Sequence, residues 1–372
     1  MKKNIFKTNN GAVSIFVVIF FSLLITVVIV GFIRNSIKDQ QASLARNLSQ
    51  SAYDASQVGI EDAKRLLVRY SRQCPTESST DANCVELKSA LQSNRCNNAV
   101  SLLTGSEIVS NEVLIQKDAL SNYNQAYTCV TISRTTDDFL GYLNGDDAKV
   151  VPLLGIGDFD SIQFQWFTRD NIASNATSAT LNTITNLPKA IDYNLNSPPI
   201  VALKLIQAPS SFDSSTLSNS SNTYSRLLIK PDPSYSDPTL TSFNIDAPLS
   251  PKIIYRSKCD ANFSSGYSCS VKLSLPTLTD RQISLLEVKP LYNNMDYRVT
   301  LWKGDNLVQF NNVQTKIDST GRASDIFRRI ETRVESSFSQ AYPVSAVEIT
   351  GSLCKDFGVT DVASTPYRTC TP

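Results

Sequence analysis

An uncharged run of 22 residues, Ala12 to Ile33, constrains the fold of this chain more than any other feature. The run contains no proline, three lysines precede it, and Arg34 follows it directly. As a helix with a rise of about 1.5 Å per residue, it extends about 33 Å and can cross a hydrocarbon core of about 30 Å. We therefore expect residues 12–33 to form a transmembrane helix.

The flanking residues predict how this helix is oriented. Lysines on its N-terminal side favour a cytoplasmic N-terminus and an exported C-terminal portion. A cleaved secretory signal would have a shorter apolar segment followed by an Ala-x-Ala-like site, whereas Gly-Phe-Ile-Arg closes this run. We expect a single-pass protein of the cytoplasmic membrane whose domains lie outside the cell.

The helical pattern continues beyond the bilayer, and we expect the extracytoplasmic half of the helix to span residues 34–72. Proline is absent until Pro75, and small or apolar residues recur at helical steps of three and four. Their small size predicts close packing under a β-sheet. A dimeric coiled coil is the alternative, although alanine and glycine make a poor seam. The stripe consists of Ala45, Leu48, Ala52, Ala55, Gly59, Ala63, Leu66 and Tyr70.

All eight cysteines follow the apolar run, and the chain has neither a CxxC motif nor any histidine. This pattern predicts disulfides formed in an oxidising compartment rather than a metal site. Neighbours in sequence are the expected partners, Cys259 with Cys269 and Cys354 with Cys370, while the remaining connectivity stays open. A disulfide from Cys129 to the loop after the helix would link the sheet covalently to the helix. The other candidates are Cys74, Cys84 and Cys96.

The rest of the chain predicts a cysteine-bearing connection over residues 73–124, with a short helix at 82–93, and a β-rich exported domain over 125–372. The fold class is therefore α+β, with a long N-terminal transmembrane helix packed on an antiparallel sheet. A hairpin is expected from 252–259 and 269–275, and a turn at 318–321 before an Arg-rich strand. The other strands are expected at 125–132, 149–154, 161–167, 200–206, 282–288, 297–302 and 307–310.

Composition excludes several classes of function. With 35 basic and 34 acidic residues, the chain has no charge excess that favours nucleic acid. Without histidine, P-loop or Gly-x-Ser-x-Gly motif it meets no criterion for an active site, so we expect neither enzyme activity nor a cofactor. The spacing of the aspartates at 146, 147, 158 and 160 does not match an EF-hand, and we expect them in solvated turns.

The sequence Gly11-Ala12-Val13-Ser14-Ile15, followed by the unbroken apolar helix, resembles the class III signal of type IV prepilins. It is similar in particular to the N-terminal region of PilX-type minor pilins, as are residues 47–63 and the strand at 317–335. The resemblance implies a pilin-like fold and cleavage after Gly11 by a prepilin peptidase. It also implies methylation of the new N-terminus at Ala12 and assembly with other pilin subunits.

Two positions differ from the pattern of major pilins, which begin with phenylalanine and carry glutamate at the fifth mature position. Here these positions are Ala12 and Phe16. In the family, that glutamate neutralises the N-terminal amine of a neighbouring subunit, so its absence fits a minor subunit, such as one at a filament tip.

The expected function is therefore that of a minor structural subunit of a type IV pilus, acting in pilus assembly or in adhesion to an unknown surface ligand. Two alternatives remain open. One is a membrane-anchored extracytoplasmic binding protein that never enters a filament, and the other is a secretion-system pseudopilin.

Overall fold

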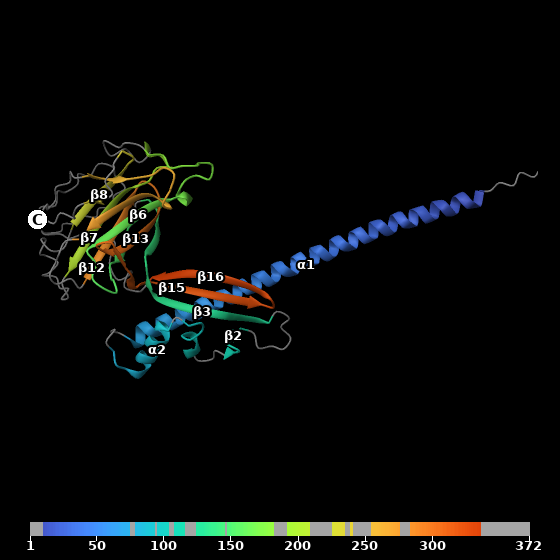
Figure 1. Ribbon diagram of the computed structural model, residues 1–372, viewed down its shortest axis with the longest axis horizontal. Helices are drawn as coiled ribbons and strands as arrows, with labels where there is room; N and C mark the ends of the chain where they lie inside the picture. The colour runs from blue at the N-terminus through green and yellow to red at the C-terminus, as the bar shows by residue number, and fades with distance from the viewer. Residues whose placement is uncertain are drawn as a thin grey trace, which may run out of the picture. The chain divides into compact units, whose positions relative to one another are not determined.

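The computed structural model has an α+β fold, with one long N-terminal helix, mostly antiparallel β-sheets and three disulfides, which confirms the predicted fold class at this level. The chain forms two compact units (Figure 1). Unit 1 comprises residues 1–134 and 315–334, and unit 2 comprises residues 135–314 and 335–372. The structure describes residues 10–74, 79–93, 95–103, 108–115, 124–145, 147–181, 192–208, 225–234, 239–240, 254–275 and 283–335.

Helix α1 spans Asn10–Gln73 without interruption, a length of 64 residues. In the part of the chain that the structure describes, it is the one helix long and apolar enough to cross a membrane. The predicted transmembrane segment at 12–33 and the predicted extracytoplasmic segment at 34–72 therefore form one continuous helix. Cys74 follows the helix directly, and its backbone N–H still donates to the carbonyl of Tyr70 at 2.8 Å.

Unit 1 is built on a five-stranded sheet that packs against the C-terminal part of α1 (Figure 1). Its strand order is β1-β2-β3-β15-β16, so segments from early and late in the chain are neighbours. The division between the units falls inside three of these strands. The bounds are β1 Ile108–Val109, β2 Glu112–Leu114, β3 Gln125–Thr136, β15 Phe310–Ala323 and β16 Ile326–Glu335.

Two glycines allow α1 and this sheet to approach each other closely. A Cβ atom on Gly321 of β15 would overlap the backbone of α1 at Ala52 and Ser56. A Cβ atom on Gly59 of α1 would lie 2.7 Å from Cγ2 of Val130 in β3 and would overlap the hydroxyl of Ser319. The helix backbone cannot move away from a Cβ atom at position 321, so Gly321 has to be glycine, whereas at position 59 the side chains of Ser319 and Val130 would have to shift.

The connection after α1 folds back onto the same core. It contains α2 (Ala82–Gln92), whose N-terminus is capped by Asp81, and a short 3-10 helix, η1 (Val100–Leu102). The buried Asn97 fastens the connection to the sheet, since its amide donates to the carbonyl of Thr128 at 3.0 Å and accepts from the N–H of Val130 at 2.8 Å. A positive φ of 60° at Asn97, which asparagine tolerates better than most residues, allows this geometry.

Unit 2 contains two further sheets, with strand orders β10-β8-β7-β12-β5 and β14-β13-β6-β11-β9, and β4 also pairs with β13. Most neighbours are antiparallel, but β10 with β8 and β11 with β9 are parallel. The strands are β4 Phe139–Leu143, β5 Lys149–Pro152, β6 Ser161–Thr168, β7 Ile200–Ala208, β8 Ser225–Asp232, β9 Thr239–Leu240, β10 Ile254–Lys258, β11 Tyr267–Ser274, β12 Ile283–Leu291, β13 Met295–Lys303 and β14 Asn306–Val308.

Aromatic side chains fill the core of unit 2. Phe164 of β6 lies 5.4 Å from Trp166 and 5.9 Å from Tyr297 between ring centroids, and all three side chains are buried. Tyr297 also covers Gly141 on the adjacent strand β4, where a side chain would collide with its ring. The strand predicted at residues 161–167 is therefore present as β6, with Ile162, Phe164 and Trp166 in the core.

Two local predictions were wrong. The segments at 252–259 and 269–275 do not form a hairpin, because β10 joins β8 and β11 joins β6, and only the pair Cys259 and Cys269 bridges them. The turn expected at 318–321 lies inside β15, and the chain turns instead at Ser324, which has a φ of 54°. The glycine at 321 serves the helix contact rather than a turn.

We expect Gly321→Ala to lower the free energy of unfolding of unit 1 by about 1–3 kcal/mol, because the added methyl group overpacks a backbone contact. The change should appear as faster hydrogen exchange at α1 residues 50–66, measured by mass spectrometry on the full chain in detergent micelles. Gly157→Ala is the control, because a Cβ there would have no neighbour within 4 Å. Equal exchange in the two variants would show that the close approach is unimportant.

Candidate functional site

Helix α1 has two parts with opposite environments. From Ile15 to Ile37 its large apolar side chains are exposed, with Phe16 reaching 79%. From Ala52 onward one face of the helix is buried against the sheet, where Ala52 and Leu66 are fully covered. The exposed apolar part requires an apolar surrounding, because this much hydrocarbon in contact with water is strongly unfavourable.

The predicted processing site lies at the start of α1. The helix begins at Asn10, so the peptide bond between Gly11 and Ala12 is in its first turn. The first four N–H groups of a helix have no partner within it, and first turns open more easily than helix interiors. A peptidase that needs an extended backbone would therefore have to unwind only this turn.

The structure places most of the predicted packing stripe under the sheet. Ala52, Ala55, Ala63 and Leu66 are at most 1% exposed, Gly59 is buried and Leu48 is half-buried.

Ala45, which was expected in the stripe, is instead exposed. The described part of the sheet makes its outermost polar contact with α1 at Ser49, whose hydroxyl accepts from Nε of Arg328 at 2.8 Å. Ala45 lies one helical turn before that contact, which explains its exposure.

Polar contacts fix the position of the helix under the sheet. The hydroxyl of Tyr127 in β3 donates to Asp62 of α1 at 2.9 Å. The guanidinium of Arg134, at the other end of β3, lies 4.4 Å from the ring centre of Tyr70. Neither contact can be predicted from local sequence, because both join α1 to a strand more than 60 residues away.

Strand β16 forms one edge of the sheet, and two of its charged side chains pair with residues of β15. Arg329 pairs with Asp318, and Glu331 pairs with Lys316 at 2.7 Å, both partners lying on β15. Charged side chains on an edge strand discourage pairing with the strand of another molecule, and these pairs are consistent with that role. The same strand also has a large apolar side chain in contact with solvent, that of Phe327, which is 55% exposed.

Six of the eight cysteines form three disulfides within the described residues. Cys74–Cys84 joins the end of α1 to α2, and Cys96–Cys129 joins the connection to β3, where the sequence had suggested a staple. Cys259–Cys269 is bonded as expected from its short spacing. The predicted pair Cys354 and Cys370 lies outside the described residues.

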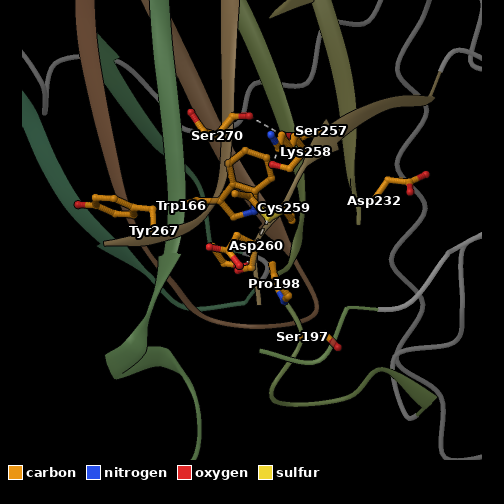
Figure 2. The surroundings of a disulfide bond; sticks show 12 residues. Trp166, Ser197, Pro198, Asp232, Ser257, Lys258, Cys259, Asp260, Tyr267 and Ser270 are labelled. Carbon is orange, nitrogen blue, oxygen red and sulfur yellow. Dashed lines mark hydrogen bonds between the residues drawn. A yellow bond between two sulfur atoms is a disulfide. The ribbon is translucent and has the colours of Figure 1, made fainter. Parts of the chain in front are cut away.

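The Cys259–Cys269 disulfide closes a surface loop of unit 2, shown with its surroundings in Figure 2. Trp166 of β6 lies close to this disulfide, and its indole N–H donates to the carbonyl of Pro199 at 3.1 Å. Inside the loop, the hydroxyl of Ser264 and the backbone N–H groups of Asn262 and Ser264 donate to the carboxylate of Asp260. These donors stabilise the charged form and lower the pKa of Asp260.

No group of three or more cysteine, aspartate or glutamate side chains suited to a metal ion occurs among the described residues. Asp160 is engaged within the chain, because it accepts from the hydroxyl of Ser161 and from the N–H of Gly304, and these bonds lower its pKa. Asp158 pairs with Lys303 at 3.5 Å, and Asp146 lies outside the described residues. Burial raises the pKa of the phenols of Tyr193 and Tyr297, whose rings belong to packed clusters.

Comparison with known proteins adds no assignment, since no family model, curated protein or solved structure matches this chain. Interpretation of the site therefore depends on its own geometry.

We expect Asp260→Asn to remove part of the pH dependence of stability. Because the folded-state pKa of Asp260 lies below its unfolded value of about 3.9, its stabilising effect is complete above that value. That effect is lost as pH falls through the folded-state pKa. Thermal unfolding of both chains from pH 7 to pH 2 should show a difference that shrinks on acidification. A difference independent of pH would contradict this account.

Proposed function

We propose that this chain is a minor pilin-like subunit of a type IV pilus, with the exposed part of α1 as its assembly element. The observation that carries the proposal is the continuity of α1, since one unbroken helix links an apolar segment of membrane length to the sheet that covers its far end. The PilX-like signal at Gly11 and Ala12 supports the same reading from the sequence.

The mechanism is an exchange of apolar contacts. In the membrane, lipid covers the side chains from Ala12 to Ile33, and in a filament the helices of neighbouring subunits replace that lipid. Either environment removes the same apolar surface from water, so subunit storage and assembly depend on one physical property.

The part of α1 outside the bilayer acts as a spacer before the folded domain. Between Arg34 and Leu48 the helix carries mainly polar side chains, and it rises about 20 Å at 1.5 Å per residue. Because the sheet does not cover this part of α1, the helices of neighbouring subunits can pack against it. The absence of an acidic residue at Phe16 supports a minor subunit rather than a repeating one.

A membrane-anchored binding protein outside any filament is the second candidate, favoured by the paired charges on β16, which leave that edge without evident need of a partner strand. A secretion-system pseudopilin would share the processing of a pilin. Neither enzyme activity nor a cofactor forms part of the proposal.

The N-terminus tests the first candidate directly. We expect mass spectrometry of the chain, isolated from cells with a prepilin peptidase, to find a methylated Ala12 at its start. The same mature chain should occur in filaments sheared from the cell surface. Gly11→Leu should leave the leader attached, because the peptidase loses its recognition residue, whereas Gly31→Ala in the same helix should be processed normally.

The outcomes separate the three candidates. A chain that still begins at Met1 in such cells would refute the pilin-like and pseudopilin assignments together and leave the anchored binding protein. A processed chain that is absent from sheared surface filaments would instead favour the pseudopilin.

A further inference from the structure

One end of unit 2, here called the loop end, collects segments that are distant in sequence. It consists of residues 144–145, 169–181, 192–199, 259–266 and 292–294. Hydrogen bonds join these segments to one another. The amide of Asn293 donates to the carbonyls of Asn194 and Ser197, both at 2.8 Å, and the N–H of Ala179 donates to the carbonyl of Ala261 at 2.9 Å. The loops therefore form one cross-linked surface.

Two stacked aromatic pairs pack at the loop end of unit 2. Tyr193 and Tyr292 stack at 4.5 Å between ring centroids, and Phe167 and Phe263 stack at 6.4 Å. In each pair one ring, that of Tyr193 or Phe167, is buried. The other ring, that of Tyr292 or Phe263, is only partly buried, and Phe263 also packs against the core of unit 2. Each pair thus presents an aromatic side chain at the loop end.

The backbone at these rings is unusual. Tyr292, Phe263 and Phe167 have φ values of 80°, 55° and 66°, a region that bulky residues rarely adopt because Cβ crowds the backbone. Among the described residues, these three are the aromatic residues with positive φ, and all belong to the two stacked pairs of the loop end. Conformations of this kind gather at ligand sites, where the surrounding structure holds them in place.

The exposed side chains of the loop end are mostly amides and hydroxyls, and few are charged. In the segments that define it, the exposed charged residues are Arg169, Asp170 and Asp192. The exposed amides and hydroxyls are Asn144, Ser174, Asn175, Thr177, Asn194, Asn262, Ser264, Ser265 and Asn294.

We propose that the loop end of unit 2 binds a neutral oligosaccharide. An asparagine amide both donates and accepts hydrogen bonds, as each sugar hydroxyl does, and partly exposed aromatic rings can receive the C–H face of a sugar ring. The exposed charges are one arginine and two aspartates, so the surface has no positive excess that would favour an anionic polymer. Because the loops are already cross-linked, little order has to be gained on binding.

This inference rests on the exported position of unit 2 in the proposed function and gives the adhesion role a ligand class. It does not depend on cleavage at Gly11, so the two can fail separately. A processed filament subunit without sugar binding would leave the proposed function intact, whereas a sugar-binding chain with its leader attached would refute the pilin assignment alone.

The test uses the full chain in detergent micelles, applied to an array of neutral, sialylated and sulfated oligosaccharides. We expect retention on neutral oligosaccharides that changes little between low and high salt, because no charge pair is involved. The double variant Asn175→Ala/Asn262→Ala should bind the best neutral probe at least about tenfold more weakly, equivalent to about 1.4 kcal/mol.

Controls separate binding from folding. Neither Asn175 nor Asn262 makes a side-chain hydrogen bond within the described residues, so the double variant should unfold at the wild-type temperature. Ile156→Ser is the matched control, because Ile156 is exposed in unit 2 but lies outside the loop end. Lack of retention on every neutral probe, salt-sensitive binding to charged probes alone, or equal binding by the double variant would each overturn the proposal.

Discussion

The contact of two backbones, between Gly321 of β15 and α1 at Ala52 and Ser56, governs how unit 1 is built. A helix and a sheet usually meet through side chains, but here the strand reaches the peptide groups of the helix. The second glycine, Gly59, admits Val130 and Ser319 on the adjoining stretch. The close approach of the strand to the helix backbone leaves room only for small residues on this face of α1. Because alanine contributes little hydrophobic area, stability depends on the fit being complete along the whole stripe.

Besides this interface between α1 and the sheet, two disulfides hold unit 1 together. Both disulfides of unit 1 lie at the end of α1 that enters the folded domain, and together they connect α1 through α2 to β3. Leu87 and Leu91 of α2 pack in the core of unit 1, and the buried Asn97, next to Cys96, is hydrogen-bonded to β3. Disulfides limit the freedom of the unfolded chain most where closed loops are long, and Cys96–Cys129 closes 33 residues. The two disulfides thus add covalent links to a connection that also packs in the core of unit 1.

Local sequence patterns predicted what depends on neighbours in sequence. The absence of proline and the three-four spacing predicted α1, and the short helix expected at 82–93 is present as α2, whose buried face includes Leu87 and Leu91. Pairing between distant strands was inaccessible, since β3 meets β15 through residues such as Thr128 and Thr320, 192 positions apart. The Ser-Thr-Gly triplet at 319–321 shows what local sequence cannot predict. Glycine is common both in turns and where two backbones approach closely, and only the folded structure shows that Gly321 has the second role. The loop end was missed for the same reason, as its stacked rings come from four separate segments.

The exposed apolar part of α1 cannot be explained by the fold of either unit. Nothing in the described chain covers the side chains between Ile15 and Ile37, although such a surface would aggregate in water. A soluble domain would bury this face or replace it with polar residues, and neither has occurred. Because Gly321 and Gly59 commit only the C-terminal part of α1 to the sheet, the remainder stays available for lipid or for other helices. Either environment would remove the apolar side chains of this part of α1 from water, which the folded units do not do by themselves.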